Sequence, residues 1–404
     1  MIEYLSYILF FTTLIIFIIY IYIRLKYGFW AVQPVFHVYN LLYMFNPPGV
    51  ISSLLPEKNK YTNFKNIDTI IFQELSQLKQ TRLVNFIRSN YLQNKDNVFS
   101  PQSENILPYF TGHNTKSFIS FYNEENLMMD LKKGTMIEDT KIVGLMTTRP
   151  IHISIHNSDS NSNTKNSKFD AYYVDYLCVD KMYRKKGIAS QVIQTHEYNQ
   201  RQLNKNIVVS LFKREDELTG IVPLCVYSTY GFSVNKWTKP SELHPSYKLI
   251  EVNPQNFHFL FDFIKNNGNK FDIVINTEVT NIIELIKSKN IFIYTIILDD
   301  NIICAYFFRK TCTFIEKNME VLSCFASIKD CDDDIFIQGF KISFWKIAAE
   351  NYFGFAAIEE ISHNSVIIDN LKIKTQPLIV SPTAYFFYNF AYPTFRAEKV
   401  LILN

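Results

Sequence analysis

The sequence of 404 residues lacks the motifs that metal, disulfide-rich and nucleic-acid-binding proteins need. Its six cysteines include no C-x-x-C pair, and its eight histidines do not complete a zinc spacing. Because the cysteines are scattered through apolar segments, we predict that they are reduced and buried, with no metal and no disulfide. The 41 Lys and Arg residues nearly balance the 38 Asp and Glu residues, which argues against a nucleic-acid partner.

Glycine is also scarce, with 11 residues, whereas phenylalanine and tyrosine number 35 and 25. So many rings are typical of cores packed with aromatic side chains, although a large apolar ligand site would show the same composition. The length of the chain allows two domains, or one large double domain with an ample core.

Charged side chains are absent from residues 5–23, which run from Leu5 to Ile23 and are almost all apolar or aromatic. This length is sufficient to cross a ~30 Å hydrocarbon core as a helix. Arg24 and Lys26 follow at once, so the positive-inside rule predicts a single-pass membrane anchor with the rest of the chain in the cytosol. A cleaved signal peptide or a buried core helix fits less well, because no small-residue cleavage site and no polar face are present.

Helical and strand-like segments alternate after the anchor. The spacing of apolar residues predicts helices over 68–92 and 187–204, and β-branched and aromatic residues predict strands over 116–126, 140–156 and 169–180. The polar stretch 157–168 predicts an exposed hairpin loop. Helix and strands then recur in a similar order after a seam near residues 241–247. The pattern predicts an α+β fold, with an anchor and basic flank over 1–26 and two halves over 27–240 and 241–404.

The stretch RKKGIAS (184–190) lies between the apolar run 173–179 and the second of these helices. A helix N-terminus offers unpaired backbone N–H groups and a positive dipole end to an anion. Gly187 lets the backbone approach a ligand, and the cations of Arg184, Lys185 and Lys186 suit a pyrophosphate. A basic turn that only caps a helix would have the same residues, so the stretch alone leaves both readings open.

Its context resembles the acyl-CoA-binding turn of the GNAT acyltransferase superfamily, and LCVYSTYGF (224–232) lies where that superfamily has a Tyr-x-x-x-Gly-Phe segment. Further stretches resemble the eukaryotic N-myristoyltransferases, over about residues 27 to 404. The stretches are YGFWAVQPV (27–35), NYLQNKDNVF (90–99), GLMTTRPIHI (144–153), VDYLCVDKMYRKKGIA (174–189) and FFYNFAYPTFRAEKVLILN (386–404).

This resemblance implies two GNAT-like halves related by a pseudo-twofold axis, with mixed twisted sheets flanked by helices. It implies transfer of a myristoyl group from CoA to the amine of an N-terminal glycine, with myristoyl-CoA as co-substrate and no permanently bound cofactor. The backbone N–H groups of Tyr176 and Leu177 would polarise the thioester, and the α-carboxylate of Asn404 would be the base. Thr219 and Asn204 would help to hold the amine. The acyl-CoA contacts would come from Tyr27, Phe29, Trp30, Cys178, Val179, Arg184, Lys185, Lys186, Gly187, Ile188 and Ala189.

The chain departs from the family pattern in three places. Its AEKVLILN ending is one residue shorter, an acidic run is reduced to Asp96 beside Lys95, and the family normally lacks a transmembrane anchor. The leading hypothesis is therefore a membrane-anchored acyltransferase acting on proteins with an N-terminal glycine. Two alternatives stay open, a GNAT N-acetyltransferase that uses acetyl-CoA and a catalytically inactive relative that binds acyl-CoA or lipopeptides.

Overall fold

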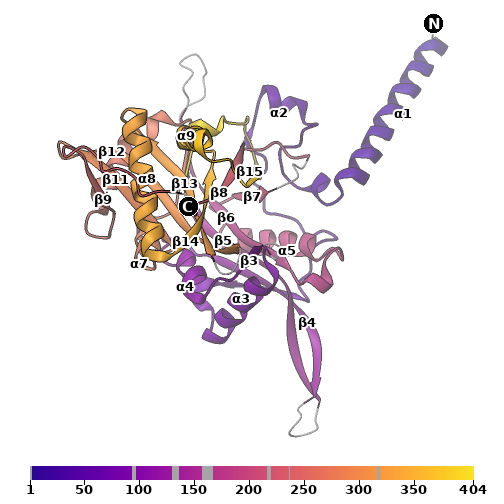
Figure 1. Ribbon diagram of the computed structural model, residues 1–404. Helices are drawn as coiled ribbons and strands as arrows, with labels where there is room; N and C mark the ends of the chain where they lie inside the picture. Colours follow the sequence, from indigo (N-terminus) through magenta and orange to yellow (C-terminus); the bar gives the residue numbers. More distant parts are fainter. Residues whose placement is uncertain are drawn as a thin grey trace.

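The computed structural model describes residues 2–92, 97–129, 136–156, 167–215, 220–235, 237–315 and 319–404. Over these residues the chain forms one large mixed sheet with helices around it, as Figure 1 shows. The α-helices are α1 (Ile2–Tyr27), α2 (Leu41–Phe45), α3 (Gln77–Asn90), α4 (Ser103–Ile106), α5 (Ile188–Leu203), α6 (Phe257–Asn267), α7 (Val279–Lys287), α8 (Asp333–Asn351) and α9 (Asn364–Lys374). Short 3-10 helices are η1 (Trp30–Val32), η2 (Phe72–Glu74), η3 (Leu107–Phe110), η4 (Lys181–Tyr183), η5 (Gly268–Lys270) and η6 (Ala397–Lys399).

The strands alternate with these helices along the chain, which confirms the predicted α+β class. They are β1 (Gly49–Val50), β2 (Ile67–Ile71), β3 (Asn97–Phe99), β4 (Phe118–Met129), β5 (Met136–Ile155), β6 (Ser167–Val179), β7 (Val209–Glu215), β8 (Cys225–Ser233), β9 (Lys248–Glu251), β10 (Ile273–Asn276), β11 (Ile291–Leu298), β12 (Asn301–Ile315), β13 (Met319–Lys329), β14 (Phe353–Glu359), β15 (Ile379–Tyr388), β16 (Phe390–Ala391) and β17 (Val400–Leu403). A separate two-stranded sheet pairs β1 with β16.

Fifteen strands belong to the single large sheet, where separate sheets were expected. From β5 its order runs β5-β6-β7-β15-β8-β14-β13-β12-β11-β9, with β4 and β10 both beside β5. Two parallel pairs flank the central pair β15–β8, one on each side: β6 with β7, joined through α5, and β13 with β14, joined through α8. Between them β15 pairs with β7 and β8 pairs with β14, so each half of the chain contributes a strand to the other side.

Local sequence explains most element boundaries, with one correction. The helix predicted over 68–92 is wrong in its first part, because Ile67–Ile71 pair with β4 as strand β2. β-Branched side chains favour this extended pairing. The helix α3 begins only after Ser76, whose side chain accepts a hydrogen bond from the backbone N–H of Lys79 as an N-cap. The predicted hairpin loop at 157–168 lies mostly outside the described residues, and β6 begins at Ser167.

The abundant aromatic residues are largely core. Nine of the twelve largest fully buried side chains are phenylalanines, and the first of the twelve is an arginine, Arg149. One large group of apolar side chains, called here the central cluster, joins β6, β12 and β13 to α3, α6 and β17. A smaller group, the turn-side cluster, contains Ile67, Tyr122, Val143, Met146, Ile188, Val192 and Ile193. These two clusters lie next to the candidate site.

Helix α1 extends away from the rest of the molecule (Figure 1). Most of its described side chains are exposed, with Ile8 at 64%, Phe11 at 58% and Phe17 at 57% of their full exposure. Among the described helices, Tyr7–Tyr27 is the segment long and apolar enough to cross a membrane, which an N-terminal signal sequence would also be. The predicted apolar helix is therefore present, and it is not a buried core helix.

Candidate active site

Strand β6 contains a β-bulge at the position where the sequence comparison places the catalytic backbone amides. Met146 pairs with Leu177 and Thr148 pairs with Val174, so Asp175 and Tyr176 together face Thr147 alone. A bulge leaves an extra residue without its regular ladder partner and redirects the groups around it. The freed backbone N–H of Tyr176 donates instead to the Thr147 hydroxyl, at 3.1 Å. This amide is one of the two that the resemblance implies for polarising a thioester.

The residues around the bulge divide between the two faces of β6, because successive side chains of a strand point in opposite directions. Leu177 and Val179 pack on the turn-side cluster, together with Phe29, Trp30 and Ile188. Tyr176 and Cys178 belong instead to the central cluster on the other face. The structure thus brings four of the residues predicted to contact the acyl-CoA, Phe29, Trp30, Val179 and Ile188, to one face, and places Cys178 on the other.

The basic turn after β6 has the backbone conformation that a glycine favours. Gly187 has φ +77°, is the N-cap of α5, and would have no heavy atom within 4 Å of an added Cβ. The left-handed φ therefore explains the glycine, and the open space leaves room for a ligand. Lys185 is also left-handed, with φ +65°. The first turn of α5 contains the buried Ile188 and the half-buried Ala189.

The cations of this turn have different surroundings. Lys185 and Lys186 are exposed, and the Lys186 ammonium lies 4.7 Å from the ring centre of Tyr183. Arg184 instead donates to the backbone oxygens of Asn90, at 2.9 Å, and Val179, at 3.3 Å. The two lysines thus remain available to an anionic ligand, whereas Arg184 ties the turn to the end of α3.

A buried chain of hydrogen bonds fixes α5 on the sheet. His196 Nδ1 lies 2.8 Å from Ser120 Oγ, and its Nε2 lies 2.9 Å from Thr148 Oγ1. Thr148 in turn donates to Gln200 Oε1 at 2.6 Å. This pattern fits a neutral imidazole that accepts from Ser120 and donates to Thr148. Burial lowers the pKa of His196 to about 4, so the ring stays neutral and holds α5 in place at neutral pH.

The aromatic residues before the first 3-10 turn separate into two groups. Phe29 makes edge contacts with Trp30 and Tyr61, with ring centres 5.2 and 5.0 Å apart, and Trp30 stacks on Phe212 at 5.8 Å. Tyr27 lies elsewhere, 5.8 Å from the ring of Tyr39. Its ring covers Gly220, where an added Cβ would come within 2.0 Å of it. Phe29 and Trp30 therefore reach the turn-side cluster, whereas Tyr27 packs outside it.

The end of the chain is held in the interior. Strand β17 pairs in parallel with β10, and the backbone N–H of Thr277 donates to the Leu403 oxygen at 3.1 Å. Asn404 is only 3% exposed, and its side-chain Nδ2 and Oδ1 have no hydrogen-bond partner among the described residues. It lies beside a small apolar cavity lined in part by Phe257, Phe307 and Phe325. The expected burial of the last residue is thus observed, and Leu403 and Tyr176 pack in the same central cluster.

A group of buried charges, called here the charged interior, also lies next to the bulge. Its members are Arg149, Asp175, Lys213, Arg309 and Glu359, which come from five different strands. Arg149 Nε donates to both Asp175 oxygens, at 3.0 and 3.1 Å, and Lys213 Nζ lies 3.0 Å from Glu359 Oε2. Sequence reasoning missed this group, although a basic and an acidic residue within the apolar runs GLMTTRPIHI and YVDYLCV were signals for it.

Burial acts differently on the two carboxyl groups of the charged interior. Burial raises the pKa of Asp175, and the nearby Arg149 and Arg309 only partly offset this effect. Burial would also raise the pKa of Glu359, but Lys213, Arg309 and the hydroxyl of Tyr227 lower it on balance. The Tyr227 hydroxyl donates to Glu359, so the tyrosine of the GNAT-like segment is engaged within the protein.

Of the two predicted amine-binding residues, the structure describes Asn204. Thr219 lies outside the described residues, as do Lys95 and Asp96 of the altered acidic run. Asn204 follows α5 at the end away from Gly187, and its Nδ2 donates to the Tyr172 hydroxyl at 2.8 Å. This contact joins the C-terminus of α5 to β6.

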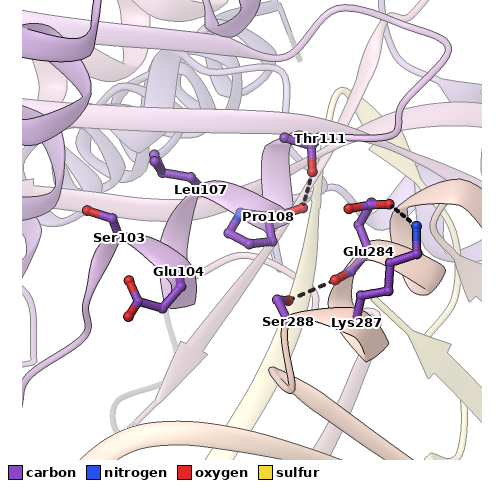
Figure 2. A pocket seen from close by; sticks show the side chains of 8 residues that line it. All are labelled: Ser103, Glu104, Leu107, Pro108, Thr111, Glu284, Lys287 and Ser288. Atoms are coloured by element: carbon purple, nitrogen blue, oxygen red, sulfur yellow. Dashed lines mark hydrogen bonds and ion pairs between the residues drawn. The ribbon is translucent and has the colours of Figure 1, made fainter. Parts of the chain in front are cut away.

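An open groove on the surface lies between α4, η3 and α7 and is shown in Figure 2. Its polar side chains bond mainly within the groove. Thr111 donates to the Pro108 oxygen, Lys287 pairs with Glu284 at 2.8 Å, and Ser288 donates to the Glu284 backbone oxygen. Because these groups already have partners, the groove is a weaker candidate for chemistry than the bulge.

Comparisons with known proteins bear on the fold. No protein-family model matches the chain. A protein of Amsacta moorei entomopoxvirus, provisionally named glycylpeptide N-tetradecanoyltransferase, is 24% identical over 251 residues, which is 59% of this chain and 78% of that protein. The structure of Saccharomyces cerevisiae N-myristoyltransferase with bound myristoyl-CoA superposes with a TM-score of 0.66, at 13% identity, over 91% of this chain and 94% of the yeast chain. Another structure of the yeast enzyme, with myristoyl-CoA and inhibitors, gives a TM-score of 0.64 at 14% identity, over 92% of this chain and 91% of that one. The chain therefore has the fold of the N-myristoyltransferases.

Proposed function

We propose that the protein transfers a fatty acyl group, myristoyl first among those to test, from CoA to the N-terminal glycine amine of proteins. The observation that carries this proposal is the bulge at Asp175 and Tyr176, which frees a backbone amide beside the turn-side cluster. The likeness of the chain to N-myristoyltransferase supports acyl-CoA and a glycine amine as the two substrates.

The acyl-CoA would lie along the turn-side face of β6. Backbone N–H groups at the start of α5, with Lys185 and Lys186, would bind the pyrophosphate, because a helix N-terminus favours anions. Phe29, Trp30, Leu177 and Val179 would cover the apolar part of the ligand. Arg184 would support this turn from the protein side, through its bonds to Asn90 and Val179.

In the reaction the glycine amine attacks the thioester carbonyl, an amide bond forms, and the carbon–sulfur bond breaks. The oxyanion that develops on the carbonyl would accept hydrogen bonds from the N–H groups of Tyr176 and Leu177. The Tyr176 N–H must first leave the Thr147 hydroxyl or share its hydrogen with the new acceptor. The α-carboxylate of Asn404 would take a first proton from the ammonium before attack. The second proton, which the attacking nitrogen loses as the amide forms, would go to the CoA thiolate as it leaves.

Two further features belong to the proposal. The strand order, with its two parallel crossovers and exchanged strands, supports two GNAT-like halves over 27–240 and 241–404, related by a pseudo-twofold axis. The exposed helix α1 supports a single-pass anchor that leaves the catalytic part in the cytosol, because Arg24 and Lys26 flank its end. Acyl-CoA and acylated products both associate with bilayers, so an anchor would hold the enzyme near both.

The test is incubation of purified full-length protein with labelled myristoyl-CoA and peptides that begin with glycine. We expect label on these peptides and none on matched peptides whose glycine amine is acetylated. A parallel assay with acetyl-CoA separates the N-acetyltransferase alternative, which the engaged Tyr227 hydroxyl does not favour. A folded protein that binds myristoyl-CoA but modifies no peptide would instead be the inactive relative.

A further inference from the structure

Arg149 is buried with part of its hydrogen-bonding capacity unused. The residue is 1% exposed, and its guanidinium lies between the rings of Tyr109 and Tyr173, 5.5 and 5.3 Å from their centres. Its Nε bonds to Asp175, but its Nη1 has no partner among the described residues. A buried cationic N–H group without an acceptor is costly, so such a group indicates that an acceptor is missing.

A second guanidinium in the charged interior has the same property. Arg309 is half-buried, lies 4.3 Å from the ring centre of Phe325, and has a buried Nε without a partner among the described residues. Its charge acts on both Asp175 and Glu359, whose pKa values it lowers relative to burial alone. Neither carboxylate, however, forms an ion pair with Arg309, because Asp175 pairs with Arg149 and Glu359 pairs with Lys213.

Within the charged interior three side-chain cations face two side-chain carboxylates. Each carboxylate has its own cation, and Arg309 is the cation left over. Three tyrosines around it, Tyr109, Tyr173 and Tyr385, are at least nine-tenths buried. Their hydroxyls make no hydrogen bond to another described residue, so they add donors to the same space. Several donors and one excess positive charge match a carboxylate, which is an anion with two acceptor oxygens.

The position of the charged interior relative to the bulge indicates which carboxylate would bind. Asp175 and Tyr176 are consecutive residues of the bulge, while the phosphate-binding turn lies beyond the other face of β6. The anion is therefore a part of the peptide and not of CoA. An extended residue spans about 3.3 Å, so only the first few residues after the glycine reach this far from the reacting amine.

We infer that the charged interior is a specificity site for an acidic side chain at one of positions two to four of the substrate peptide, which binds between Arg149 and Arg309. This inference rests on the proposed acyl transfer and names the class of its peptide substrate. The aspartate or glutamate supplies the acceptor that Arg149 Nη1 and Arg309 Nε lack, and it balances the excess charge.

The test uses peptides that begin with glycine and differ at one position, where Asp, Glu, Asn, Gln or Lys is placed in turn at positions two, three and four. With the full chain and myristoyl-CoA, we expect kcat/KM for Asp or Glu at one position to exceed that for Asn or Gln by about tenfold, mainly through KM. Arg309→Met should remove this preference. Arg396→Met, the same change at an exposed arginine, should retain it. A double variant, Arg149→Met with Asp175→Asn, removes the first pair without leaving a buried charge unpaired.

Peptide binding, measured by the fluorescence anisotropy of labelled peptides in the presence of myristoyl-CoA, gives a readout that does not need turnover. If peptides are acylated with equal efficiency whatever their charge, or if Arg309→Met keeps the preference, the inference is wrong and the proposed function stands. If no peptide is acylated, the proposed function is wrong. Tighter binding of acidic peptides that Arg309→Met abolishes then supports the site, and equal binding of all peptides contradicts it.

Discussion

The backbone N–H of Tyr176 and the side-chain hydroxyl of Thr147 are joined by a hydrogen bond of 3.1 Å across the bulge of β6. In the free protein this bond satisfies an amide that the strand ladder leaves unpaired, because Asp175 and Tyr176 together face one residue of β5. The substrate carbonyl would replace the hydroxyl as acceptor during acyl transfer. The Thr147 hydroxyl should therefore stabilise the free protein more than it stabilises the acyl-CoA complex.

Thr147→Val should destabilise the free protein more than its acyl-CoA complex. Loss of the hydroxyl leaves the buried N–H of Tyr176 without an acceptor, at a cost of about 1–3 kcal/mol. The thioester carbonyl restores an acceptor in the complex, so acyl-CoA should raise the Tm of the variant more than that of the wild type. Thermal unfolding with and without myristoyl-CoA measures both shifts. Thr147→Ser keeps the hydroxyl and is the control; equal ligand-induced shifts in Thr147→Val and wild type would contradict the role of this amide.

The cations of the turn after β6 should separate into binding and structural residues. Replacing Lys185 and Lys186 together by Gln should weaken myristoyl-CoA binding by about tenfold, because both exposed ammonium groups would be lost to the pyrophosphate. The effect should shrink as salt rises, since exposed charges are screened. Titration calorimetry at two ionic strengths measures it, with Lys181→Gln on the same surface as the control. Unchanged affinity in the double variant would exclude this turn as the phosphate site.

Arg184→Gln should behave differently, since its guanidinium bonds to the oxygens of Asn90 and Val179. We expect this variant to have a lower Tm than the wild type. Its affinity for myristoyl-CoA should change less than that of the double lysine variant, also at high salt.

An addition of two residues, Gly-Ser, after Asn404 should abolish transfer without preventing acyl-CoA binding. The last residue is buried at the end of β17, and an added dipeptide moves the α-carboxylate from that place. Loss of a general base lowers turnover by about 10²–10⁴-fold. Single-turnover kinetics and myristoyl-CoA binding are measured together, and the same dipeptide at the N-terminus is the control. Full activity of the extended chain would show that another group accepts the proton.

The stability that His196 contributes should fall as the pH drops from 7 to 5. Burial lowers the pKa of His196 to about 4, below the ordinary histidine value of 6.5, so in this window the unfolded state binds a proton that the folded state does not. The contribution is therefore lost as pH falls below 6.5, by about 2 kcal/mol at pH 5. Burial raises the pKa of Glu197 to about 7, so Glu197 stabilises the fold as the pH falls, opposite to His196. This effect of Glu197 is the same in the wild type and in a His196→Gln variant.

The difference between wild type and His196→Gln therefore isolates the imidazole. Urea denaturation followed by tryptophan fluorescence at pH 7 and pH 5 should show a smaller pH-dependent loss in the variant. His244→Gln, an exposed histidine, is the control. An equal loss in all three proteins would mean that His196 is protonated in the folded state.

The exposed helix α1 should anchor the chain. In cells we expect the full-length protein to stay in the membrane fraction after alkaline carbonate extraction, because Tyr7–Tyr27 is long and apolar enough to span a bilayer. A variant that begins at Tyr27 should be soluble. N-terminal sequencing of the membrane-bound protein distinguishes an anchor from a cleaved signal sequence. An anchored chain keeps the apolar segment, whereas a chain from which a signal sequence was cleaved lacks it.

The features that could be predicted from the sequence are those determined by residues adjacent to one another in the chain. The turn at 184–190 was predictable because the glycine, the cations and the following apolar spacing are contiguous, and Gly187 indeed has a positive φ. The expected burial of Asn404 followed from the apolar residues before it and the resemblance of the ending. The strand β2 was missed because Ile67, Ile70 and Ile71 also fit a helical spacing, and their pairing with β4 decided the outcome.

The charged interior, in contrast, was not predicted as a group. Arg149, Lys213 and Arg309 come from separate strands, and their proximity depends on the order and register of the sheet. Neither can be read from a single sequence, because each charge taken alone fits a solvent-facing position of its strand. The surroundings of Asn204 likewise depend on tertiary structure, since its Nδ2 donates to the hydroxyl of Tyr172 on β6.

The exchange of β8 and β15 has a consequence for how the chain reaches this structure. Strand β15, from the last part of the chain, lies between β7 and β8, and β8 in turn pairs with β14. During synthesis residues 27–240 therefore emerge with β8 lacking both neighbours and β7 lacking one, and the sheet is complete only after residue 403 has been made. Such long-range pairing slows folding and leaves strand edges open to other chains. A gene fragment that ends near residue 240 would encode an incomplete sheet.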